Sequence, residues 1–231
     1  MKTNFFIKSF IMCAFLFAGT VMEAQDWPNL DRFHKDNSAL GLPAKGESRV
    51  IFMGNSITQN WIEARPEFFT NRPYINRGIS GQTTPQMLLR FRQDVIALQP
   101  KVVIILAGTN DIAGNTGPST LEMIEDNLAS MAELAKENGI RVVLSSVLPV
   151  YDYPWKPGLK PAEKIVTLNK WIKQYCFTKG FVYLDYFTPM ADERNGMKSA
   201  LTMDGVHANL DGYKVMEPLV EVAIQKALHQ R

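Results

Sequence analysis

The chain has 231 residues, of which 25 are Lys or Arg and 23 are Asp or Glu, so its formal net charge at pH 7 is +2. This near balance, with no block of like charges, excludes the strongly charged surface typical of proteins that bind nucleic acid or an anionic membrane. A chain of this length is long enough to bury a substantial hydrophobic core as one domain.

The first 24 residues have the pattern of a secretory signal sequence. A basic start is followed by a short apolar stretch over residues 10–21 and by the small residue Ala24, after which we expect cleavage. The stretch is too short to span a bilayer comfortably, but Met22 is larger than the residue usual at its position, which leaves a retained membrane anchor as the alternative. Cleavage would remove Cys13 and leave only Cys176. We therefore expect an exported protein, periplasmic or extracellular, without an internal disulfide or stable membrane insertion.

Residues 25–48 contain several Pro and Gly residues and are predicted to form an irregular lead-in, whereas residues 49–231 are predicted to form one domain. Within this domain, short runs rich in β-branched residues alternate with longer stretches of helical period, the pattern of a parallel sheet covered by helices. The predicted strands cover residues 50–53, 74–76, 102–107, 141–147 and 182–185. The predicted helices cover residues 85–98, 119–138, 161–178 and 210–229. Ser119 and Glu122 have the spacing of a capping box at the start of the second helix.

Four short polar segments follow predicted strands or precede the last helix. They are Gly54-Asn55-Ser56-Ile57-Thr58, Asn76-Arg77-Gly78-Ile79-Ser80-Gly81, Gly108-Thr109-Asn110-Asp111 and Asp204-Gly205-Val206-His207. In an open parallel sheet, ligands bind beyond the carboxyl ends of the strands. We therefore expect all four segments to meet at one edge of the sheet.

Ser56 is the candidate nucleophile. It lies just after a predicted strand, where a turn into a helix can raise a hydroxyl into a cleft and point the amino end of the helix at developing negative charge. The alternative is that Ser56 only caps the helix that follows. No Gly stands two residues after Ser56, so the nucleophile-elbow pattern of the α/β-hydrolases is absent.

Asp204 and His207 are the candidate carboxylate and general base. Their separation of three residues allows a single turn to place the carboxylate beside one ring nitrogen, which fixes the tautomer and stabilises the imidazolium. His34 and His229 have no comparable acidic partner near the expected site. The alternative is a purely polar turn before the last helix.

Gly81 and Asn110 are candidate donors to an oxyanion. Gly81 can bring a backbone N–H close to a substrate because it has no side chain, and Asn110 can offer a side-chain amide to the same oxygen. Each also has a structural interpretation, Gly81 as a turn former and Asn110 as a loop residue bonded to its own backbone.

Taken together, the four segments resemble the four sequence blocks of the SGNH hydrolases, also known as GDSL-like lipases or acylhydrolases. The resemblance implies Ser56 as nucleophile, Asp204 and His207 as the rest of a catalytic triad, and Gly81 and Asn110 as oxyanion donors beside the Ser56 amide. It also implies a flavodoxin-like, three-layer α/β/α sandwich around a central, mostly parallel five-stranded sheet, with no metal and no organic cofactor. The usual Gly-Asp-Ser of the family is Gly-Asn-Ser here.

Substrate choice must come from the loops around the cleft. The segment after the fourth predicted strand carries Tyr151, Tyr153 and Trp155 between prolines, and these aromatic rings can stack on a sugar, with Trp61 as the opposite wall. Packing of this loop onto its own domain is the alternative.

The sequence therefore predicts an exported serine ester hydrolase that removes short acyl groups, above all acetyl, from small-molecule or saccharide esters, with carbohydrates as the leading substrate. Two alternatives remain open. One is a lysophospholipase or an esterase similar to platelet-activating-factor acetylhydrolase. The other is a catalytically silent carbohydrate-binding protein with the same fold.

Overall fold

The structure is a computed structural model that describes residues 26–230, so the predicted signal sequence lies outside the described residues. It contains a five-stranded sheet in the order β2-β1-β3-β4-β5, and every strand pair is parallel. The strands are β1 (Val50–Gly54), β2 (Tyr74–Gly78), β3 (Val102–Leu106), β4 (Arg141–Ser145) and β5 (Val182–Leu184). The predicted sheet is confirmed, and it is parallel throughout.

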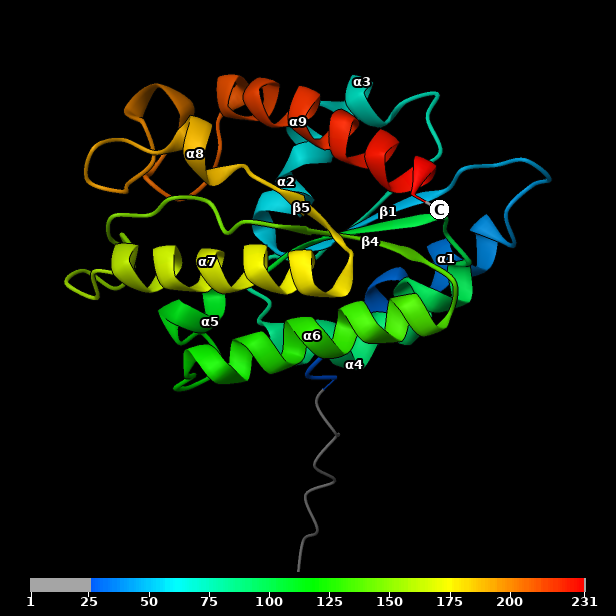
Figure 1. The fold of residues 1–231 in the computed structure, drawn as a ribbon, viewed down its shortest axis with the longest axis horizontal. Coiled ribbons are helices and arrows are strands. Elements are labelled where there is room, and N and C mark those ends of the chain that lie inside the picture. The colour runs from blue at the N-terminus through cyan, green and yellow to red at the C-terminus, as the bar shows by residue number, and fades with distance from the viewer. Residues whose placement is uncertain (1–25, 231) are drawn as a thin grey trace, which may run out of the picture.

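Helices cover both faces of the sheet and make a three-layer sandwich (Figure 1). On one face lie α4 (Thr84–Asp94), α5 (Thr109–Ala113), α6 (Leu121–Glu137) and α7 (Ala162–Lys179). On the other face lie α2 (Ser56–Ala64), α3 (Pro66–Phe69), α8 (Phe187–Met190) and α9 (Leu210–His229). Among residues 26–230, no helix is long and apolar enough to cross a membrane.

The central strands β1 and β3 are buried on both faces, and successive residues point to opposite layers. In β1, Ile51 and Met53 belong to the core beneath α4, α6 and α7, whereas Val50 and Phe52 belong to the core beneath α2 and α9. This two-residue alternation explains why the sequences of β1 and β3 are apolar at nearly every position, whereas the edge strand β2 contains Asn76 and Arg77.

The structure corrects three details of the sequence analysis. The lead-in of residues 25–48 contains a short 3-10 helix (Leu30–Phe33) and helix α1 (His34–Leu40). The cap of α6 is Thr120, whose side chain accepts a hydrogen bond from the Met123 N–H, and not Ser119. The short helices α2, α3, α5 and α8 were not predicted, because segments of four to nine residues carry too few helical turns to show a period.

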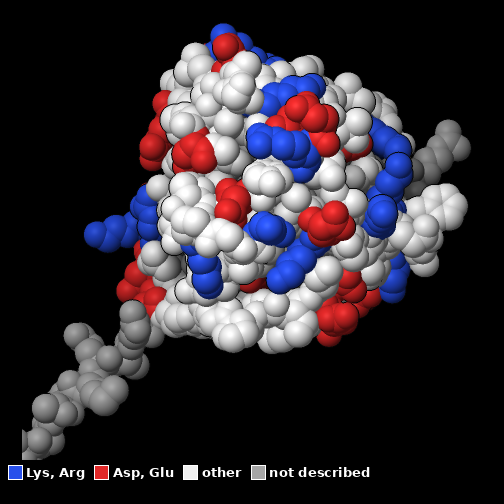
Figure 2. Space-filling view, turned by 90° about the vertical axis from the view of Figure 1, so that its left-hand side faces the viewer, with Lys and Arg blue, Asp and Glu red and all other residues white. Residues whose placement is uncertain are grey.

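The carboxyl ends of the strands lie at the end of the molecule that carries α8, because α8 directly follows β5 (Figure 1). Figure 2 shows this end face-on. Lys and Arg side chains are interspersed there with Asp and Glu, and neither sign dominates the face. The surface around the strand ends therefore offers no uniform field to attract a polyanion or a polycation.

Candidate active site

The polar segments meet at the carboxyl edge of the sheet, as expected. Gly54, at the end of β1, is level with Gly78 of β2 and with Leu106 of β3. Gly78 must be glycine because a Cβ atom there would lie 2.2 Å from the backbone nitrogen of Gln59, so its absence lets α2 pack directly on β2. Ser56 follows this edge at the amino end of α2.

Asn55, and not Ser56, caps helix α2. The Oδ1 atom of Asn55 accepts a hydrogen bond from the Ile57 N–H at 3.0 Å, while Ser56 is the first residue of the helix. The structural alternative for Ser56, a helix cap, is therefore wrong. Its hydroxyl is left for another partner.

That partner is His207. The Ser56 Oγ atom lies 3.0 Å from the Nε2 atom of His207, and the Nδ1 atom of the same ring lies 2.7 Å from Oδ2 of Asp204. An ionised carboxylate only accepts hydrogen bonds, so Nδ1 donates to Asp204. In the neutral ring Nε2 is then the acceptor, and the Ser56 hydroxyl donates to it. This chain of hydrogen bonds can remove a proton from a serine hydroxyl and stabilise the cation that results.

The loop before α9 fixes the Asp204 carboxylate. Its Oδ1 atom accepts from the backbone N–H groups of Val206 at 2.9 Å and of His207 at 2.8 Å. Burial by itself raises the pKa of the Asp204 carboxyl, but the backbone and ring hydrogen bonds of His207, with that of Val206, bring it below its ordinary value. Asp204 is therefore held as a carboxylate against the imidazole.

Gly81 and Asn110 both follow strand ends at this edge. Gly81 has a φ of +77°, a conformation that favours glycine, and nothing lies within 4 Å of the position that a Cβ atom would take. Asn110 lies in α5 and is 4% exposed. Its Nδ2 atom donates to the backbone carbonyl of Gln82 at 2.9 Å, which ties α5 to the loop that contains Gly81.

Asp111 reinforces the same connection, a role that the sequence analysis missed. Its buried carboxylate accepts from the Thr84 N–H at 2.9 Å and from the Thr84 hydroxyl at 2.6 Å, at the amino end of α4. Burial raises the pKa of the Asp111 carboxyl, although the bonds from Thr84 oppose the rise. The adjacent side chains of Asn110 and Asp111 therefore bind Gln82 and Thr84, at the end of the loop that leads into α4.

The four aromatic residues predicted to bind substrate fall into two groups. Tyr151 and Trp155 are each 46% exposed, and the Trp155 ring centroid lies 6.2 Å from that of His207. Tyr153 is fully buried and donates its hydroxyl hydrogen to the Thr109 carbonyl at 2.8 Å. It cannot stack on a ligand, and the prediction for Tyr153 was wrong.

Trp61 likewise does not line the candidate site. It is 1% exposed and stacks between Phe68, at a centroid distance of 5.2 Å, and Tyr213, at 5.4 Å. Trp61 therefore belongs to the core between α2 and α9. Its predicted contact with substrate was wrong, because α9 covers the helix face on which it lies.

Comparison with known proteins agrees with this architecture. The sequence profile of the GDSL-like Lipase/Acylhydrolase family matches residues 52–215. A proposed acylhydrolase from Bacteroides fragilis is 46% identical, with a TM-score of 0.87 over 89% of this chain and 100% of that chain. A GDSL-like lipase from Bacteroides thetaiotaomicron is 48% identical, with a TM-score of 0.85 over 87% of this chain and 99% of that chain.

More distant matches include one sequence relative and one protein that shares only the fold. The lipoprotein YqeF of Bacillus subtilis is 34% identical over 48% of this chain and 53% of its own length, so the matched part is about half of that relative. A variant of an acetyl-xylooligosaccharide esterase from Geobacillus has the same fold, with a TM-score of 0.60 over 80% of this chain and 98% of that chain at 20% identity. On the family profile and the two Bacteroides structures, the chain belongs to the GDSL-like lipase/acylhydrolase family.

Proposed function

We propose that this protein is an exported serine esterase that removes short acyl groups, above all acetyl, from carbohydrates. The observation that carries the proposal is the hydrogen-bond chain from Ser56 Oγ through the His207 ring to Asp204, with distances of 3.0 and 2.7 Å. Serine, imidazole and carboxylate in this order are the parts needed for acyl transfer through a covalent intermediate.

In the proposed mechanism, Ser56 Oγ attacks the ester carbonyl carbon while its proton passes to Nε2 of His207. The tetrahedral intermediate then collapses, its bond to the alcohol oxygen breaks, and the His207 imidazolium returns the proton to the departing alcohol. A water molecule attacks the acyl-serine by the same steps in reverse, which releases the carboxylic acid. Asp204 stays ionised throughout and holds the ring in the productive tautomer.

The oxyanion of that intermediate is assigned to three donors. They are the backbone N–H of Ser56 at the amino end of α2, the backbone N–H of Gly81 and the Nδ2 group of Asn110. The positions of Gly81 and Asn110 beyond the level ends of β2 and β3, and the bond from Asn110 to the Gly81 loop, support this assignment. Loss of one such donor typically lowers kcat by about 100- to 1000-fold.

Three observations support a carbohydrate ester as substrate. The exposed indole ring of Trp155 lies next to His207, where it can stack on a sugar ring bound at the ester. The face at the strand ends carries charges of both signs, which suits a neutral ligand (Figure 2). The Geobacillus protein of the same fold acts on acetylated xylooligosaccharides.

The signal-like sequence of residues 1–24 and the lipoprotein relative support export.

A fluorophosphonate probe followed by mass spectrometry tests the nucleophile. We expect one covalent adduct on Ser56 in the folded wild-type protein and none in Ser56→Ala. Absence of an adduct in folded wild-type protein would reject the esterase and favour the silent carbohydrate-binding protein.

Hydrolysis of nitrophenyl esters of increasing chain length, together with acetylated oligosaccharides, tests the substrate. We expect kcat/KM to be highest for acetyl esters and acetate to be released from the oligosaccharides. Activity that peaks at eight or more carbons would reject the carbohydrate proposal in favour of a lipid esterase.

A further inference from the structure

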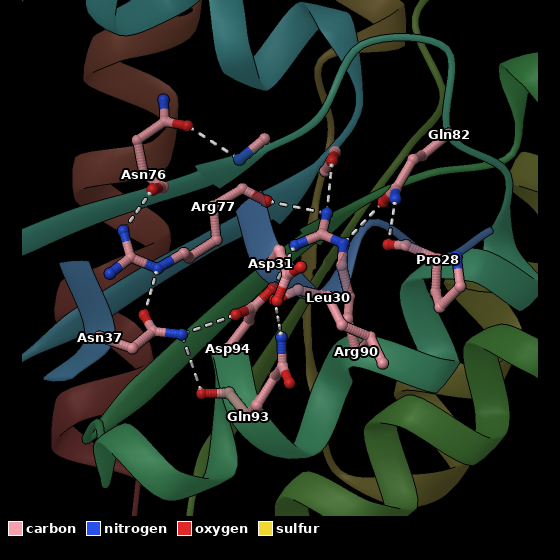
Figure 3. Close-up of polar contacts among 12 residues, drawn as sticks. Pro28, Leu30, Asp31, Asn37, Asn76, Arg77, Gln82, Arg90, Gln93 and Asp94 are labelled. Carbon is pink, nitrogen blue, oxygen red and sulfur yellow. Dashed lines mark hydrogen bonds and ion pairs between the residues drawn. The ribbon is translucent and has the colours of Figure 1, made fainter. Parts of the chain in front are cut away.

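A buried guanidinium joins the carboxyl ends of β1 and β2 (Figure 3). Arg90, on α4, is 0% exposed, and its Nη2 atom donates to the carbonyls of Gly54 at 3.2 Å and of Arg77 at 2.9 Å. Its Nη1 atom donates to Asp94 at 3.0 Å and its Nε atom to Oε1 of Gln82 at 2.6 Å. Burial lowers the pKa of Arg90 to about 10, so the group remains a cation at neutral pH.

Gln82 links Arg90 to Asn110, a residue of the proposed oxyanion site. Its side chain is held at both ends, because Oε1 accepts from Arg90 while Nε2 donates to the Pro28 carbonyl at 2.7 Å (Figure 3). Its backbone carbonyl accepts the hydrogen bond from Asn110 Nδ2 at 2.9 Å. Gln82 is only 3% exposed, so it has little freedom to move away from these partners.

The bond from Asn110 determines where its amide points. A primary amide has two N–H groups that diverge in one plane, so when one is bound to the Gln82 carbonyl the direction of the other is fixed. An oxyanion donor is effective only when its hydrogen is already aimed at the developing charge. We propose that Gln82 and Arg90 are positioning residues that aim Asn110 at the oxyanion, an inference that rests on the proposed esterase function.

Gln93, on α4, offers a control for Gln82. Gln93 donates its Nε2 hydrogen to the Leu30 carbonyl at 2.6 Å, just as Gln82 donates to that of Pro28. The two bonds hold residues 26–31 against α4 and the turn before it, but no hydrogen bond links Gln93 to Asn110 in the described part of the chain. Gln93→Met therefore removes the corresponding bond to the same segment without disturbing the proposed oxyanion donor.

The test compares Gln82→Met with Gln93→Met in the full chain, with nitrophenyl acetate as substrate. We expect Gln82→Met to lower kcat by about tenfold or more with KM changed less than about twofold, because a donor aimed away from the oxyanion fails only in the transition state. We expect kcat of Gln93→Met to stay within about twofold of wild type. An unchanged kcat in folded Gln82→Met, or equal losses in both variants, would overturn the proposal.

A double-mutant cycle separates positioning from general damage to the fold. If Gln82 acts through Asn110, Gln82→Met should cause no further loss of kcat in a protein that already carries Asn110→Ala. A purely structural role predicts instead that the two losses multiply, and that result would overturn the proposal.

Two further arms keep the test decisive. Should Gln82→Met fail to fold, Arg90→Lys retains a positive charge beside Asp94 but has no Nε donor for Gln82, so kcat should again fall only when Asn110 is present. An unchanged kcat in folded Arg90→Lys would overturn the role of Arg90.

Fluorophosphonate labelling of wild-type Ser56 reports on the esterase function separately. If the wild type is labelled and active but Gln82→Met is unaffected, only the positioning role is rejected. If the wild type is inactive, both the esterase function and the positioning role are rejected.

Discussion

The Nε2 atom of His207 lies 3.0 Å from the Oγ atom of Ser56, although the two residues are 151 positions apart in the chain. Each reaches this position through a different element. Ser56 is set by the end of β1 and the amino end of α2, and His207 by the loop before α9. The two elements pack on the same face of the sheet, where Tyr213 of α9 donates its hydroxyl hydrogen to the Ile57 carbonyl of α2 at 2.8 Å. The pairing is therefore anchored by contacts outside the site itself.

This pairing predicts that Ser56→Ala and His207→Ala each lower kcat by on the order of 10⁴-fold or more. The double variant should lose little beyond either single one, because the two groups act as a unit in one proton transfer. Steady-state hydrolysis of nitrophenyl acetate measures the loss, and thermal unfolding should show both variants folded with Tm near that of wild type. Losses that multiply in the double variant would contradict a shared step.

The hydrogen bonds to Asp204 predict the shape of the pH profile. Histidine side chains change charge between about pH 5 and 8, and an imidazolium cannot accept the serine proton, so activity should fall on acidification. Since its hydrogen bonds lower the pKa of Asp204, this carboxylate stays ionised across that range. The acid limb of log kcat/KM should therefore have a slope of one, set by a single proton. A flat profile, or a slope of two, would argue against these roles.

The motifs made most of the site predictable because each combines a residue type with a position after a strand. Ser56, Gly81 and Asn110 follow strands whose ends are level in the sheet, so their convergence follows from the parallel topology. The spacing of Asp204 and His207 is local and needs only one turn. In these cases a short stretch of sequence indicates both the type of side chain and its position in the fold.

The aromatic residues and the buried arginine were not predictable in the same way. Trp61 and Trp155 are the same residue type, yet one is 1% and the other 46% exposed, because α9 covers the first and nothing in the local sequence encodes that cover. In the sequence, Arg90 resembles any charged residue on the exposed face of a helix. Its burial depends on backbone carbonyls at the ends of β1 and β2, and no pattern within α4 indicates them.

The two tryptophans should respond oppositely to truncation. Trp61→Ala should lower the free energy of unfolding by about 3–5 kcal/mol, because it removes a large ring from a closed core. Trp155→Ala should change it by less than about 1 kcal/mol, while raising KM for acetylated oligosaccharides more than KM for nitrophenyl acetate. Urea unfolding and steady-state kinetics measure the two effects. A large stability loss in Trp155→Ala would assign it to packing instead.

Cys176 should be inert in the folded protein. Its side chain is 1% exposed, and burial raises the pKa of the thiol to about 12, so almost no thiolate exists at pH 8. We expect no reaction of Cys176 with iodoacetamide until denaturant is added, and full esterase activity after the treatment. Mass spectrometry of the Cys176 peptide measures the modification. Rapid alkylation in native conditions would contradict the burial.

The cap of α2 should matter for both stability and catalysis, because the same turn holds Ser56. Asn55→Ala removes the acceptor for the Ile57 N–H and should lower the free energy of unfolding by about 0.5–2 kcal/mol. It should also lower kcat, since the first turn of α2 places the proposed nucleophile. Thr120→Ala is the matched control, because Thr120 caps α6 through the Met123 N–H and has no proposed part in the reaction. Urea unfolding should show a loss of stability in both variants, but only Asn55→Ala should lose turnover. Equal kcat in the two variants would mean that Ser56 keeps its position without the cap.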